Sequence, residues 1–212
     1  MQLGEDTITM SMTLNPVNEA AFQKAVQSLE TLNRAAVFHP TGTGKSCIAW
    51  KVVEAHPQTT FFWLVAGAQR LALRQAELTR YNGGTLPGNV RFCDCEKLAA
   101  ATPEQWVRLG EQKPGCIVLD CYHELSAVCW AQSVQKLLRM CPQAKVLGLG
   151  VPNGAPVCAA AQELFADCIV SHMTVAEAMA AGTMPVPSAY AALLWPQEEE
   201  LATLRARIKN LC

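Results

Sequence analysis

The feature that most constrains this chain is an eight-residue segment, His39-Pro40-Thr41-Gly42-Thr43-Gly44-Lys45-Ser46. A short apolar run, 35–38, precedes it, and a stretch of helix-forming residues, 47–55, follows it. A strand, a glycine-containing loop that ends in Gly-Lys-Ser, and a helix are the layout of a phosphate-binding loop, or P-loop. The segment therefore predicts a strand and a helix joined by a loop that wraps around phosphate groups.

The residue types in this loop fit that chemistry. Glycines let the backbone approach phosphate oxygens with several N–H groups pointing inward, and the start of the next helix adds the positive end of its dipole. Lys45 would place its ammonium on the β- and γ-phosphates, and Ser46 would hold Mg²⁺ through its hydroxyl. His39 stands where the strict pattern has glycine, so a glycine-rich turn of unrelated purpose is the alternative. We assign nucleotide binding to Pro40, Thr41, Gly42, Thr43, Gly44, Lys45 and Ser46.

Strand-like and helix-like segments alternate along the rest of the chain. Continuous apolar runs of strand length, such as 61–65 and 116–119, suit a parallel sheet that is covered on both faces. Helix-forming stretches such as 18–32, 69–81 and 125–140 separate them. This order predicts an α/β fold with a doubly wound, mainly parallel sheet and flanking helices. Further expected elements are strands at 90–92 and 145–149, helices that begin with capping boxes at Thr102–Gln105 and Thr174–Glu177, and a helix over 196–210.

Composition narrows the class of protein. The chain has 212 residues, of which 50% are hydrophobic and 17% charged, so a folded globular chain is expected rather than a disordered one. Its net charge of −1 gives no overall basic field for nucleic acid. The ten cysteines include no C-x-x-C pair, and we expect neither a secretory leader nor a membrane-spanning run. These features predict a cytoplasmic protein with reduced cysteines and no membrane partner.

A second chemical signal follows the strand at 116–119, in the string Asp120-Cys121-Tyr122-His123-Glu124. A carboxylate at the end of a buried strand is where a P-loop ATPase holds Mg²⁺. The string resembles motif II, Asp-Glu-x-His, of superfamily 2 helicases, and the P-loop resembles their motif I. The chain as a whole is similar to the first RecA-like domain of DEAD/DEAH-type and restriction-enzyme-like helicases, as far as about Arg207.

The resemblance implies a P-loop NTPase of RecA-like fold that binds ATP with Mg²⁺. It places the metal on Ser46 and Asp120, and it gives catalytic roles to Lys45, Asp120 and His123. In the family, the residue that corresponds to His123 couples the state of the bound nucleotide to the rest of the helicase motor. It also implies DNA or RNA as a partner, through a segment at 64–67 with Arg70 that corresponds to motif Ia. Motif III corresponds to 148–152, where the family's Thr-Ala-Thr core is replaced by Gly150-Val151.

The departures from the family pattern predict weak hydrolysis. Cys121 replaces the glutamate that takes the proton from the attacking water, and a thiol of ordinary pKa is mostly protonated at pH 7. A general base contributes about 10²–10⁴-fold, so we expect a loss of that order. In related NTPases a second domain supplies arginines that are worth about 10³–10⁵-fold. We expect a RecA-like ATP-binding domain at 1–172 and a helical extension at 173–212 toward an absent second domain or partner chain.

Several alternatives stay open at this stage. Whether the chain is an enzyme is not decided, and a non-enzymatic pseudo-helicase that acts through partners is the main rival. A small-molecule P-loop kinase and a truncated copy of a helicase are two others. Among single residues, Gln23 could contact adenine, and His39 is expected to pack beside the loop. The aromatic run 61–63 is expected in the core rather than stacked on bases. Three arginines could contact phosphates or lie on a solvated helix face: Arg70, Arg74 and Arg80.

Overall fold

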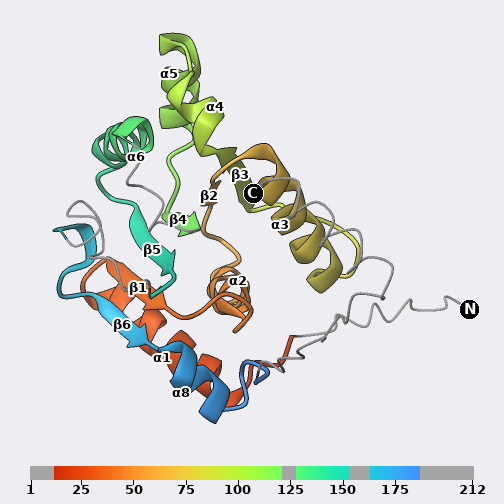
Figure 1. The fold of residues 1–212 in the computed structure, drawn as a ribbon. Coiled ribbons are helices and arrows are strands. Elements are labelled where there is room, and N and C mark those ends of the chain that lie inside the picture. Colours follow the sequence, from red (N-terminus) through yellow and green to blue (C-terminus); the bar gives the residue numbers. More distant parts are fainter. Residues whose placement is uncertain (1–11, 121–127, 153–162, 187–212) are drawn as a thin grey trace, which may run out of the picture.

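A six-stranded, all-parallel sheet forms the centre of the chain, in the order β3-β2-β4-β5-β1-β6 (Figure 1). The computed structural model describes residues 12–120, 128–152 and 163–186. The strands are β1 (Arg34–Phe38), β2 (Phe61–Val65), β3 (Val90–Asp94), β4 (Cys116–Asp120), β5 (Lys145–Gly150) and β6 (Ile169–His172). The predicted doubly wound parallel sheet is therefore confirmed.

Helices precede, separate and follow the strands along the chain. They are α1 (Pro16–Thr31), α2 (Lys45–Ala55), α3 (Ala68–Tyr81), α4 (Cys95–Ala99), α5 (Pro103–Glu111), α6 (Val128–Met140) and α8 (Val175–Ala180). Local sequence signals set several of their starts. The predicted capping boxes form at Thr102–Gln105 and at Thr174–Glu177, where each side chain bonds the backbone N–H of the other.

The two faces of the sheet carry separate halves of the core, because successive side chains of a strand point to opposite faces. On β4, Val118 packs in the half covered by α1, α2 and α3, whereas Ile117 and Leu119 pack in the half covered by α4, α5 and α6. Every residue of β2 and of β4 is buried. Burial on both faces explains why these strands are continuous apolar runs in the sequence. The aromatic run 61–63 is fully in the core, as predicted.

Two elements were not predicted from the sequence. The edge strand β6 reads Ile-Val-Ser-His, and all four residues are partly or fully exposed, so it lacks the apolar run of a buried strand. The helix α4 has only five residues, too few to show a helical period. It starts because the Asp94 side chain accepts a hydrogen bond from the backbone N–H of Glu96.

Some predictions lie outside the described residues, or the structure leaves them untested. Motif II beyond Asp120 (121–124), the helix at 196–210 and the first residues of the helix at 125–140 are outside. The boundary between 172 and 173 stays a prediction. Within the described ranges, no helix has the length and apolar character that crossing a bilayer requires, and no three acidic, histidine or cysteine side chains gather as metal ligands. The six cysteines whose side chains are described there are all free thiols.

Candidate nucleotide-binding site

The P-loop lies between the carboxyl end of β1 and the start of α2, as the sequence predicts. Gly42 and Gly44 have backbone φ angles of +87° and +90°, in the left-handed region that only glycine adopts without strain. The Thr43 hydroxyl donates to the carbonyl oxygen of Pro40 at 2.8 Å and closes the turn. Thr41 and Gly42 are exposed at the tip. The loop therefore has the shape that brings backbone N–H groups toward an anion.

Lys45 is held against the loop itself. Its ammonium Nζ donates to the carbonyl oxygens of His39 and Pro40, both at 2.8 Å. These contacts position the charge at the loop, next to the first turn of α2, where the N–H of Cys47 donates to the carbonyl oxygen of Gly44 at 2.9 Å. A cation beside the positive end of a helix dipole favours the binding of an anion.

Asn18 of α1 anchors the P-loop, and the sequence did not reveal it. Its side chain is only 3% exposed, and its amide Nδ2 donates to the carbonyl oxygen of Thr43 at 2.8 Å. A Cβ atom on Gly44 would come within 2.8 Å of that Nδ2, so the close approach requires glycine. Gln23, which the sequence suggested for adenine, instead bonds Glu19 at 2.9 Å in an exposed position. The sequence hint for Asn18 was that it is a polar residue among the apolar positions of α1.

His39 packs beneath the loop, as expected. It is fully buried, its backbone N–H donates to Gly150 of β5, and its ring Nε2 lies 2.8 Å from the hydroxyl of Ser171 on β6. Burial, reinforced by the positive charges of Lys45 and His172, lowers the pKa of His39 to about 4. The imidazole is therefore neutral at pH 7 and serves as packing between three strands.

Asp120 ends β4 on the same edge of the sheet as the P-loop. Its Oδ2 accepts hydrogen bonds from the indole Nε1 of Trp63 at 3.2 Å and from Nε of Arg74 at 2.6 Å. Arg74 also donates from Nη1 to the hydroxyl of Ser46 at 2.8 Å, and it forms an ion pair with Glu77 one turn along α3. One guanidinium group thus joins the two residues that the sequence assigns to Mg²⁺.

The guanidinium group of Arg74 stays positively charged. Burial alone would lower the pKa of Arg74, but the negative charges of Asp120 and Glu77, which also accept its hydrogen bonds, outweigh burial and raise the pKa above its usual value. Since Ser46 Oγ and Asp120 Oδ2 both accept from this cation, the arrangement does not fit a divalent ion held by the same two oxygens. Sequence reasoning left Arg74 between a phosphate contact and a solvated face, and its bonds to Asp120, Ser46 and Glu77 exclude the solvated face.

The structure thus brings Lys45, Ser46 and Asp120 together and adds Asn18 and Arg74 to them. His123 lies outside the described residues. Arg70, the candidate nucleic-acid contact of motif Ia, is exposed near the start of α3, and Arg80 lies over the ring of Tyr81 at 5.0 Å from its centroid.

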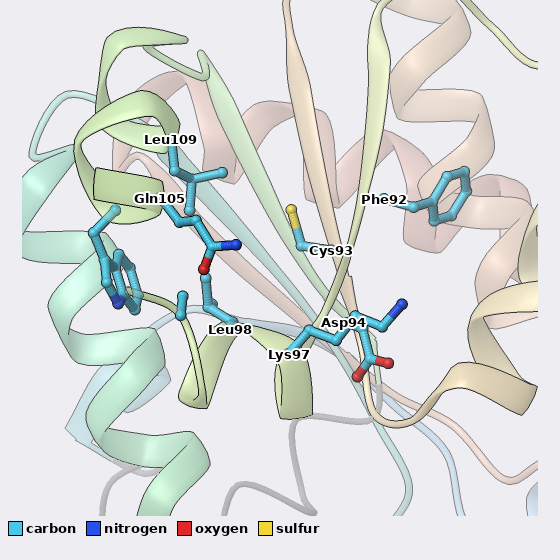
Figure 2. A pocket seen from close by; sticks show the side chains of 9 residues that line it. Phe92, Cys93, Asp94, Lys97, Leu98, Gln105 and Leu109 are labelled. Carbon is cyan, nitrogen blue, oxygen red and sulfur yellow. The ribbon is translucent and has the colours of Figure 1, made fainter. Parts of the chain in front are cut away.

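A separate hollow of about 280 Å³ lies between β3, α4 and α5. Gln105 and Leu109 of α5 face Leu98 and Cys93 across it (Figure 2). Burial raises the pKa of the Cys93 thiol to about 11, so this thiol stays protonated and unreactive at pH 7. No P-loop residue lines this hollow.

Comparison with known proteins identifies solved structures with a similar fold. No family model matches the chain, and no curated protein matches it. Among solved structures it is similar to the UvsW helicase from bacteriophage T4, with a TM-score of 0.56 at 11% identity over 76% of this chain and 60% of that one. A hypothetical ATP-dependent RNA helicase from Sulfolobus tokodaii gives 0.54 at 12% identity over 80% and 55%. The helicase MrfA gives 0.53 at 16% identity over 76% and 33%.

These likenesses show the fold. The chain has the RecA-like architecture of P-loop NTPases, which it shares with these helicases. It spans between 33% and 60% of the length of the three helicases.

Proposed function

We propose that this chain is an ATP-binding domain of the superfamily 2 helicase type, with the P-loop residues 40–46 holding the phosphates. The observation that carries the proposal is the conformation of the loop, with left-handed glycines at 42 and 44 and the Lys45 ammonium held at the start of α2. This is the arrangement of backbone N–H groups and positive charge that recognises a polyphosphate. The helicase likeness of the fold supports ATP among the nucleotides.

The prediction that Ser46 and Asp120 hold Mg²⁺ is not part of this proposal, because Arg74 bonds both of those oxygens. The roles of Lys45 and Asp120 as a phosphate contact and an acidic group of the site remain. His123 keeps its proposed coupling role on the basis of the sequence alone.

Calorimetric titration of ATP tests the proposal. The wild type should bind ATP, and Lys45→Ala should bind at least about tenfold more weakly, since a hydrogen bond to a charged group contributes about 1.5–3 kcal/mol. Lys51→Ala is the matched control, because Lys51 is on the same helix and pairs with Glu54 at 2.7 Å. Equal binding by the wild type and by Lys45→Ala would refute the P-loop assignment.

We further propose that hydrolysis by this chain is slow. Cys121 stands at the position of the glutamate that accepts a proton from water, and a neutral thiol is a poor base. If that residue alone limits the rate, Cys121→Glu should raise ATP turnover by about 10²-fold or more. No gain on that substitution would favour the rival function.

The rival function is a non-enzymatic module that binds ATP and acts through a partner. Gly150-Val151 in place of the family's Thr-Ala-Thr favours it, because the hydroxyl groups of motif III are missing. DNA or RNA is the proposed partner in either case, since the structural neighbours are helicases. A second RecA-like domain, on this or another chain, would complete the cleft. A gel-shift titration with single-stranded DNA and RNA, with and without ATP, distinguishes the partners.

A further inference from the structure

The contacts of Arg74 tie together three elements that are far apart in the sequence. The side chain leaves α3, reaches Ser46 in the first turn of α2, and reaches Asp120 at the end of β4. The side chains of Arg74 and Asp120 are only 21% and 4% exposed, so this ion pair is largely removed from water. Trp63 donates to the same carboxylate oxygen and fixes its position. A cation is thus built into the place where the sequence assigns a metal.

The guanidinium group suits a polyphosphate ligand. It is planar, permanently charged and carries five N–H donors in a fork that matches phosphate oxygens. Three of those donors serve Asp120, Ser46 and Glu77. The two N–H groups of Nη2 make no hydrogen bond to any residue within 12–120, 132–152 or 163–186. Arg74 therefore keeps donors for a ligand while its anchors hold it in place.

A divalent ion would have to compete with this group. To reach Ser46 Oγ and Asp120 Oδ2, the ion would have to displace the Arg74 guanidinium from both. Displacement would separate a largely buried ion pair, which is costly because each charge then loses its partner. A metal and an arginine side by side would also repel each other. Adding Mg²⁺ should therefore not strengthen nucleotide binding.

We propose that Arg74 takes the place of the divalent cation, so that this chain binds nucleoside polyphosphates in their metal-free form. Lys45 and Arg74 then supply the positive charge that Mg²⁺ and lysine share in a P-loop of the usual kind. The inference rests on the proposed function, namely that the P-loop binds ATP.

The test compares ATP binding by calorimetry in excess EDTA and in excess MgCl₂. For the wild type, the Kd in EDTA should equal or lie below the Kd in MgCl₂. Arg74→Gln should lose about tenfold or more of its affinity in EDTA, because it removes charge-assisted hydrogen bonds worth about 1.5–3 kcal/mol. Arg80→Gln, the same substitution on the same helix, should leave both values unchanged.

The outcomes separate the two claims. Wild-type binding in MgCl₂ but not in EDTA would overturn the inference and leave the proposed function standing. No binding in either condition would refute both. The comparison of wild-type Kd values in EDTA and in MgCl₂ needs no variant, so it tests the inference even if Arg74→Gln does not fold. Electron paramagnetic resonance of Mn²⁺ gives a second readout: no Mn²⁺ should bind to the protein with ATP, and a bound Mn²⁺ signal that disappears in Asp120→Asn would overturn the inference.

Discussion

The ion pair of Arg74 and Asp120 gives the most direct prediction about stability. Arg74→Met keeps much of the side-chain length but removes the charge that pairs with the buried Asp120 carboxylate, to which Trp63 still donates. Removing one partner of a buried pair costs about 3–5 kcal/mol. Because Arg74 is 21% exposed, water can partly replace it, and we expect a loss near the lower end, about 3 kcal/mol.

A double-mutant cycle separates the pair from other effects. Asp120→Asn keeps an oxygen for the Trp63 N–H and leaves Arg74 with Glu77, so its cost should be smaller, about 1–2 kcal/mol. In the double variant both charges of the pair are gone, so the two losses should not add. We expect a coupling energy of about 2 kcal/mol, within the range found for residues in one ion-pair network.

Urea denaturation followed by circular dichroism measures the four proteins of the cycle. The midpoint should fall while the slope m stays constant, which indicates a change in stability rather than in compactness. Thermal denaturation should show a fall of about 6–12 °C for Arg74→Met, since 1 kcal/mol shifts the midpoint by about 2–4 °C in a chain of this size. If the losses of the two single variants add to within about 0.5 kcal/mol of the loss in the double variant, Arg74 and Asp120 do not interact. That result would refute the ion pair and the role that we give to Arg74.

Three further predictions concern the loop and its supports. Because His39 has a pKa of about 4 when folded and an ordinary value when unfolded, its neutral form stabilises the fold above pH 6.5. That stability, up to about 3 kcal/mol, is lost as pH falls from 6.5 to 4, and His39→Gln should flatten the profile measured by urea denaturation. Gly44→Ala should cost about 1–2 kcal/mol more than Gly83→Ala, because both have left-handed backbones but only Gly44 meets the Asn18 amide; thermal denaturation compares them. Asn18→Ala should cost about 1–3 kcal/mol by leaving the Thr43 carbonyl without its buried donor, and an unchanged urea midpoint would contradict that anchor.

The fold was largely predictable because its strongest signals are local. The runs 61–65 and 116–119 are apolar throughout because both faces of the sheet are covered there, and Thr102 and Thr174 start helices through bonds to residues three positions away. The strand β6 was missed because it lies at an edge and its residues are partly or fully exposed, which removes the apolar signal.

The candidate site was predictable in its parts but not in its contacts. The glycines and Lys45 of the P-loop follow a spacing that the loop geometry requires. Asn18 and Arg74 act across the fold, over 25 and 46 residues of sequence, so no local pattern marks them. On its helix Arg74 has the spacing of a solvated residue, and only the packing of α3 against β2 and β3 brings it within reach of Asp120 at the end of β4.

The central claim is that the P-loop binds ATP, and backbone amide chemical shifts measured by nuclear magnetic resonance test it most directly. On addition of ATP, in EDTA or in MgCl₂, the largest shifts should fall on the amides of 41–46, and Lys45→Ala should need at least about tenfold more ATP to produce them. Shifts confined to the hollow at Cys93 and Gln105, with the P-loop amides unchanged, would contradict the claim.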